Sequence, residues 1–151
     1  MNKSNMKEKF KRAYMQTAQT FAKLSSARRL HVGAIVVKDD RIISIGYNGM
    51  PAGWDNNCED ETLYEDGGVI LKTKPEVLHA ETNAIAKLAR SNESGLGADI
   101  FVTHAPCLDC AKLIYQSGIR AVYYGKDYRD TTGVEFLVKS GVAIEKLQTE
   151  D

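Results

Sequence analysis

The chain has 151 residues, of which 43% are hydrophobic and 26% are charged, as in an ordinary globular protein with one core. Its 20 basic and 20 acidic residues balance, which argues against a polynucleotide partner. No apolar run is long enough to span a membrane and the charged N-terminus lacks a secretory stretch, so we expect a cytoplasmic protein with one domain over residues 1–151.

The first half of the chain predicts one helix and one hairpin. Apolar residues recur at three- and four-residue spacing over 5–24, which is typical of an amphipathic helix. Two β-rich runs, 32–37 and 42–47, flank a Lys-Asp-Asp turn and predict an antiparallel hairpin. We expect residues 48–76 to be mostly loop, with the acidic run 59–61 as solvated surface.

The second half alternates helices with strands. Pro106 suits the first turn of a helix, and Gly118 suits its left-handed end. We expect helices at residues 78–90, 106–117 and 131–140, and strands at residues 100–103, 121–124 and 142–147. The order α-β-β-α-β-α-β-α-β predicts a three-layer α/β/α fold around a five-stranded mixed sheet.

Three side chains with metal-binding chemistry stand at predicted helix starts. Cys107 and Cys110 form a C-x-x-C whose thiols can face one side of the first helical turn, where the helix dipole favours thiolate. His79 lies near the start of the preceding helix. Together they could supply the three protein ligands of a catalytic zinc, which keeps its fourth position open for water.

Glu81 follows His79 by two residues and can point into such a site without binding the metal. Zinc lowers the pKa of its bound water to about 7, and a neighbouring carboxylate can then carry protons. Other interpretations remain open from the residues alone. The C-x-x-C could be a redox pair or half of a structural zinc knuckle, His79 a buried core histidine, and Glu81 a solvated acid at a helix start.

The combined motifs match a known signature. H-x-E at 79–81 followed by P-C-x-x-C at 106–110 is the pattern of zinc nucleobase deaminases. The wider stretches that carry the resemblance are VGAIVVKDDRIISIGYNGMPAG at 32–53, HAETNAIAKLAR at 79–90 and PCLDCAKLIYQSGIRAVYYGKDYRD at 106–130. In them the chain resembles the deoxycytidylate (dCMP) deaminases of the zinc cytidine deaminase superfamily.

The resemblance implies a cytidine-deaminase-like fold and the hydrolysis of dCMP to dUMP and ammonia, a step that feeds thymidylate synthesis. It implies one catalytic zinc on His79, Cys107 and Cys110, with Glu81 as the proton shuttle. The family is often hexameric and regulated by dCTP with Mg²⁺, which activates, and by dTTP, which inhibits. We therefore expect a homo-oligomer, with dCMP as substrate and dCTP and dTTP as regulators.

The resemblance also implies that Asn48 contacts the deoxyribose and that Tyr128 lies at the nucleotide site. From the residues alone, Asn48 is equally a turn residue of Asn-Gly and Tyr128 a packing aromatic. The phosphate needs donors, and the candidates are Arg28, Arg29, Lys126 and Arg129.

Cys58 stands where some relatives place a ligand of a second, structural zinc. No cysteine precedes residue 32 to complete such a site, so we expect a free thiol. An odd number of cysteines also argues against a disulfide framework.

Three rival functions need to be distinguished. The tRNA adenosine deaminases share the expected fold but typically carry Glu before Pro-Cys, where this chain has Ala105, and tend to be basic. Riboflavin-pathway deaminases commonly have an attached reductase domain. A non-catalytic, zinc-stabilised binding module would need four protein ligands and no spare carboxylate such as Glu81.

Overall fold

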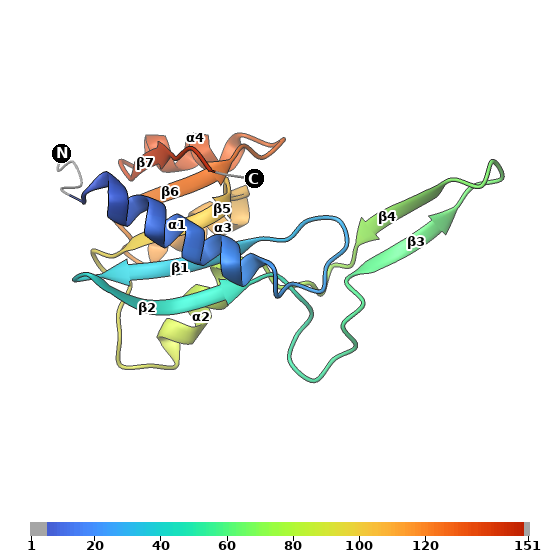
Figure 1. Ribbon diagram of the computed structural model, residues 1–151, viewed down its shortest axis with the longest axis horizontal. Coiled ribbons are helices and arrows are strands. Elements are labelled where there is room, and N and C mark those ends of the chain that lie inside the picture. Colours follow the sequence, from blue (N-terminus) through green and yellow to red (C-terminus); the bar gives the residue numbers. More distant parts are fainter. Residues whose placement is uncertain (1–5, 150–151) are drawn as a thin grey trace.

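The computed structural model describes residues 6–149, which form four helices and seven strands (Figure 1). In chain order these are α1 (Glu8–Ala22), β1 (Gly33–Lys38), β2 (Arg41–Tyr47), β3 (Glu59–Leu63), β4 (Val69–Thr73), α2 (Ala80–Ala89), β5 (Asp99–His104), α3 (Leu108–Gln116), β6 (Ala121–Lys126), α4 (Thr132–Lys139) and β7 (Ala143–Lys146). The expected helix start at Asn5 lies outside the described residues, and α1 begins at Glu8. Within 6–149, no helix combines the length and the apolar character that crossing a membrane requires.

The predicted five-stranded mixed sheet is confirmed. Its order is β2-β1-β5-β6-β7, with β1 antiparallel to both β2 and β5, and with β5, β6 and β7 parallel to one another. The β1–β2 turn places Asp39 and Asp40 at φ values of 51° and 58°. Two successive left-handed residues suit a two-residue hairpin, because their twist matches that of the flanking strands.

Helices cover both faces of the sheet, which gives the three predicted layers (Figure 1). Alternate residues of β1 show why: Ala34 and Val36 belong to a core with α2, α3 and α4, whereas Ile35 and Val37 belong to a core with α1. Side chains alternate between the two faces of a strand, so a strand covered on both sides is apolar throughout.

Helix α2 lies unusually close to strand β2. A Cβ atom built at Gly46 would lie 2.2 Å from the carbonyl oxygen of Ala80 and 2.7 Å from the backbone nitrogen of Ala84. Only glycine therefore allows the first turn of α2 to lie directly on the strand. This contact fixes the helix start that carries His79.

Strands β3 and β4 form a separate two-stranded hairpin, here called the arm (residues 59–73), which projects away from the sheet (Figure 1). Most of residues 48–76 lie outside regular secondary structure, as predicted, but the prediction missed this hairpin. The acidic run 59–61 hid the β-rich character of the segments on either side of the turn at Gly67 and Gly68, although glycine between such segments is a hairpin signal.

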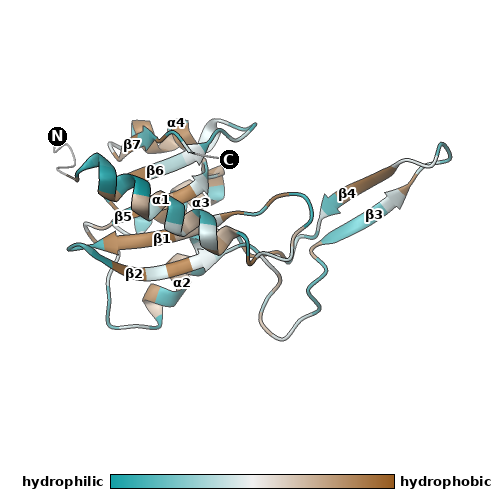
Figure 2. Ribbon diagram, in the orientation of Figure 1, coloured by the Kyte–Doolittle hydropathy of each residue, from teal (hydrophilic) through white to brown (hydrophobic). Residues whose placement is uncertain are grey.

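The arm exposes apolar side chains near its outer end. In Figure 2, hydrophobic colour extends along β4, well outside the body of the molecule. Leu63, Tyr64, Val69 and Ile70 are all at least half exposed. Isolated two-stranded hairpins are marginally stable in water, so a contact with another surface would stabilise this part of the arm.

Candidate metal and substrate site

The amino-terminal ends of α2 and α3 converge and bring together the three side chains expected to hold a metal. His79 and Cys107 are the residues immediately before the two helices; both have extended backbone, and neither side chain caps its helix. Nδ1 of His79 lies 3.3 Å from Sγ of Cys110 and 3.6 Å from Sγ of Cys107. The three donor atoms all lie within 4.8 Å of one another, the one such group found in residues 6–149.

The Cys110 thiol donates a hydrogen bond to the sulfur of Cys107, which shifts the pKa values of the two groups in opposite directions. A hydrogen bond from Cys110, with a further one from His79, lowers the pKa of Cys107 to about 4. Donation to the same Cys107 sulfur, together with burial, raises the pKa of the Cys110 thiol. A divalent metal displaces such a proton, and one imidazole with two thiolates is a donor set that zinc prefers. The residues present therefore fit zinc, with three protein ligands and room for a fourth from solvent.

Glu81 lies buried in the first turn of α2, beside these donors. Burial raises the pKa of its carboxyl group to about 7, although its own backbone N–H and the nearby His79 partly oppose this. A carboxyl group with this pKa exists in both protonation states near neutral pH. It can therefore accept a proton and return it without a large free-energy penalty in either direction.

Helix α4 supports the segment that carries Cys107. A Cβ atom at Gly133 would lie 2.1 Å from the carbonyl oxygen of Pro106 and 2.8 Å from the carbonyl carbon and oxygen of Cys107. Hydrogen at this position lets the helix pack directly against the Pro106–Cys107 peptide. Sequence reasoning missed this residue, because only the folded contact gives it a role.

A cavity of about 460 Å³ opens in front of the donor group. His79, Glu81 and Cys107 form part of its wall, and the predicted residues Asn48 and Tyr128 line it as well. Its volume suits a small organic ligand.

Asn48, which lines this cavity, connects the strand end that carries it to the segment before β1. Its Oδ1 accepts a hydrogen bond from the backbone N–H of Val32 at 2.9 Å, and its Nδ2 donates to the carbonyl oxygen of Leu30 at 2.8 Å. An amide side chain can make two further hydrogen bonds, one from the oxygen and one from the nitrogen. Asn48 therefore has a structural role and retains the capacity to bind a ligand.

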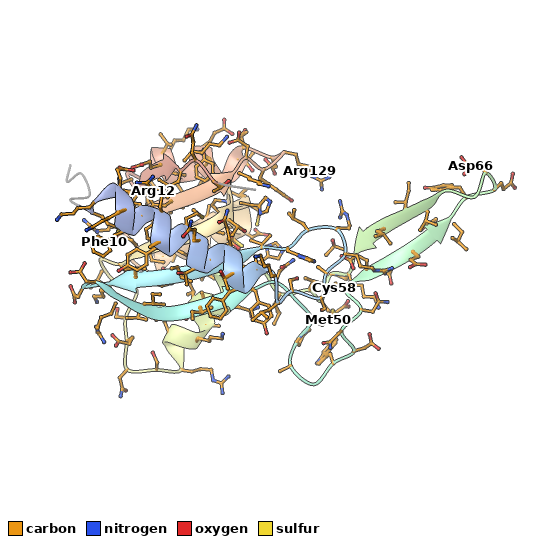
Figure 3. All side chains as sticks on the ribbon, in the orientation of Figure 1. Phe10, Arg12, Met50, Cys58, Asp66 and Arg129 are labelled. Atoms are coloured by element: carbon orange, nitrogen blue, oxygen red, sulfur yellow. The ribbon has the colours of Figure 1, made fainter. Side chains whose placement is uncertain are left out.

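Three of the four basic candidates gather at the cavity. Arg29, Lys126 and Arg129 line it, and Figure 3 shows Arg129 on the segment that follows β6. Arg28 is turned toward β3 instead, where its guanidinium contacts Glu61 and the side-chain oxygen of Asn57.

The base of the arm also contributes to the cavity wall, through Glu59 and Thr73. The expectation that the acidic run 59–61 is solvated was wrong for Glu59, whose side chain is 1% exposed. Its Oε2 accepts hydrogen bonds from the backbone N–H groups of Arg28 and Arg29 at 2.9 and 3.0 Å. A carboxylate that satisfies two backbone donors can be buried without a large penalty.

Cys58 is buried at the base of the arm (Figure 3). Its Sγ lies 3.7 Å from Oγ of Ser26 and 3.6 Å from the carbonyl oxygen of Asn56. In the described part of the chain, no group of three or more metal-binding side chains includes this residue.

Comparison with known proteins gives consistent matches. The family model of the cytidine and deoxycytidylate deaminase zinc-binding region matches residues 8–126. The chain is 34% identical to the deoxycytidylate deaminase of Enterobacteria phage T4, over 76% of each chain, and 38% identical to that of Mus musculus, over 88% of this chain and 76% of the other. The crystal structure of dCMP deaminase from the cyanophage S-TIM5 in complex with dCMP and dUMP is 47% identical, with a TM-score of 0.85, and covers 95% of this chain and 100% of the other.

Proposed function

Because the chain belongs to the cytidine and deoxycytidylate deaminase family, we propose that it is a zinc-dependent hydrolase that converts dCMP and water to dUMP and ammonia. One observation carries this proposal: two of the three metal donors, His79 and Cys107, and the buried carboxylate of Glu81 line a cavity that basic side chains also line, and the third donor, Cys110, lies next to them. The likeness to deoxycytidylate deaminases, including a cyanophage enzyme in complex with dCMP and dUMP, supports this choice of substrate.

His79, Cys107 and Cys110 would hold the zinc, which when bound supplies an acidified water molecule for attack on the ring. The extended backbone at His79 and at Cys107, just before α2 and α3, directs these two metal-binding side chains into the site. Close packing at Gly46 and Gly133 keeps α2 and α4 against their supports, so the ligands are held in place before the metal arrives.

Glu81 is the proton carrier in this proposal. Its carboxylate takes a proton from the water molecule and delivers it to the ring nitrogen next to the amino-bearing carbon. The hydroxyl group added to the ring carbon then loses its own proton to Glu81 and becomes a carbonyl. Glu81 passes this second proton to the departing amine, so that the carbon–nitrogen bond breaks and ammonia leaves. A pKa of about 7, which burial produces, suits a group that must both accept and donate.

Asn48 and Tyr128 are proposed to bind the nucleoside part, and Arg29, Lys126 and Arg129 its phosphate. Arg28 is a poorer candidate than Arg29, because its guanidinium is engaged by Glu61 in β3 and by Asn57 just before that strand. Charge-assisted hydrogen bonds to phosphate are strong enough to separate dCMP from deoxycytidine.

We also propose that the protein forms a homo-oligomer, a hexamer as the resemblance to the dCMP deaminases implies, and that it responds to dCTP with Mg²⁺ and to dTTP. The exposed apolar end of the arm, with Leu63, Val69 and Ile70, supports self-association, as does a net charge of zero. A cytoplasmic location is proposed because metal-binding thiols persist in a reducing compartment.

The test is a substrate panel of dCMP, CMP, deoxycytidine, dCTP and tRNA, with product formation followed by loss of absorbance or by chromatography. The proposed function predicts turnover of dCMP, a strong preference for it over deoxycytidine, and loss of activity in Glu81→Gln. Zinc content should match wild type in this variant, because Glu81 does not bind the metal. Turnover of tRNA alone would favour an adenosine deaminase, and stoichiometric zinc without turnover of any substrate would favour a binding module.

A further inference from the structure

The innermost residue pair of the arm, here called its innermost rung, holds Arg29 through two different contacts. Glu59 and Thr73 lie directly opposite each other in the β3–β4 register. Oε2 of Glu59 accepts the backbone N–H of Arg29 at 3.0 Å, and Oγ1 of Thr73 accepts a hydrogen bond from Nη1 of Arg29 at 3.1 Å. All three residues line the cavity in front of the metal donors. The arm therefore builds part of the wall of the site.

The two consecutive arginines take different directions from the same segment. Arg28 reaches the outer side of β3, where it contacts Glu61, and its Nε lies 3.5 Å from Oε1 of Glu59. Arg29 reaches β4 and the cavity. The carboxylate of Glu59 accepts both of their backbone N–H groups, so it fixes the segment at the point where the two side chains diverge.

Electrostatics keep Glu59 ionised in its buried position. Burial alone would raise the pKa of Glu59, but the N–H groups of Arg29 and Arg28 and the Arg28 guanidinium together hold it below its ordinary value. An anionic acceptor bonds the two backbone donors more strongly than a neutral one. The anchor is thus in place at neutral pH.

The Arg29 guanidinium retains donors for a ligand. Thr73 is an uncharged partner, and no carboxylate forms an ion pair with the Arg29 side chain among the described residues. A guanidinium has five N–H donors in a planar fork, which fits two phosphate oxygens at once. Held at one nitrogen by Thr73, the fork has a fixed orientation when a ligand enters.

We propose that Glu59 and Thr73 are positioning residues, which fix Arg29 to bind the phosphate of the substrate and so make the site select a nucleoside monophosphate over the nucleoside. This inference rests on the proposed function, dCMP deamination. It assigns the base of the arm a role in substrate selection. Glu59 and Thr73 have this role through Arg29, without touching the reacting atoms.

The first experiment is Thr73→Val, which removes the hydroxyl acceptor and keeps the shape of the side chain. We expect the KM for dCMP to rise about tenfold with kcat unchanged, because a hydrogen bond to a charged group that acts on binding alone is lost. The kinetics with deoxycytidine should not change. Thr62→Val is the matched control, since Thr62 is an exposed threonine in the same hairpin that does not line the cavity.

The second experiment combines Thr73→Val with Arg29→Met. If Thr73 acts through Arg29, Thr73→Val has no further effect on the KM for dCMP once the guanidinium is gone. Glu59→Gln should show the same dependence on Arg29, with Glu61→Gln as its control, because the Glu61 carboxylate pairs with Arg28 and, among residues 6–149, makes no hydrogen bond or ion pair with Arg29. Circular dichroism identifies any variant that fails to fold, and Thr73→Val then carries the test alone.

Three outcomes overturn the inference while leaving dCMP deamination intact: an unchanged KM for dCMP in Thr73→Val, an equal loss with deoxycytidine, or an undiminished effect of Thr73→Val in the Arg29→Met background. Absence of dCMP turnover in the wild-type enzyme would instead refute the proposed function. The two failures are therefore distinguishable from one set of kinetic measurements.

Discussion

Replacing Gly133 with alanine should damage the metal site from the far side of the Pro106–Cys107 peptide. The added methyl group would start 2.1 Å from the carbonyl oxygen of Pro106, and such contacts must open to at least 3.0 Å. Helix α4 or the cysteine segment therefore has to move by roughly 1 Å, whereas metal–ligand distances tolerate only about 0.2 Å. Misplacement on this scale is expected to lower kcat/KM by about 100-fold.

The effect on stability should be smaller than the effect on activity. Overpacking costs about 1–3 kcal/mol, and the better helix propensity of alanine returns about 1 kcal/mol of this. We expect a loss of about 0–2 kcal/mol in the free energy of unfolding, measured by urea titration. Zinc content, measured by elemental analysis after gel filtration, should fall below one per chain.

Gly49→Ala is the control for the added methyl group, because a Cβ at Gly49 meets no atom within 4 Å. It should keep full zinc content. If Gly133→Ala also retained full zinc content and the wild-type kcat/KM, the view that α4 positions Cys107 through this contact would be wrong.

Three further predictions concern the metal, the carboxylate of Glu59 and the outer end of the arm. Removing zinc with a chelator should abolish activity and lower the unfolding midpoint, and added zinc should restore both; Cys110→Ser should show no such response in its midpoint. The pKa of Glu59 lies below its ordinary value of 4.5, so its carboxylate stabilises the fold above that pH and ceases to do so as the pH falls through its folded-state pKa. The stability difference between wild type and Glu59→Gln, from urea titrations, should therefore shrink below about pH 4.5, and a constant difference would contradict the assignment. Ile70→Glu should reduce the oligomer size seen by light scattering without lowering zinc content, and an unaltered mass would exclude this end of the arm as a contact.

The core of the fold was predictable because its strands and helices have clear periodicity. The predicted strands 32–37 and 42–47 differ from β1 and β2 by no more than one residue at either end. The mixed five-stranded sheet follows from the order of the elements. Periodicity finds elements that a core covers. The arm packs against no core, so its side chains do not alternate between buried and exposed positions. Its inner half is acidic and its outer half apolar, which gives no repeating pattern to recognise.

The candidate metal donors, which the structure brings together, could be picked out from the sequence because their chemistry is local. The spacing of Cys107 and Cys110 places two thiols on one helical turn, and His79 with Glu81 forms a recognisable pair. Gly133 and Glu59 carry no comparable signal. Their roles depend on which backbone they meet in the folded protein, and a single sequence does not contain that information.

The arm is a ladder of residue pairs between β3 and β4, and its outer end is a convenient place to attach a label. Only the innermost rung reaches the cavity, and the turn beyond Leu63 lies far out along the hairpin (Figure 1). Rungs of an antiparallel ladder can be removed from the tip inward without changing the register of those that remain. A fluorophore placed on the turn should thus leave the wall of the cavity unchanged, and it would report on contacts made by the outer end of the arm from a point remote from the chemistry.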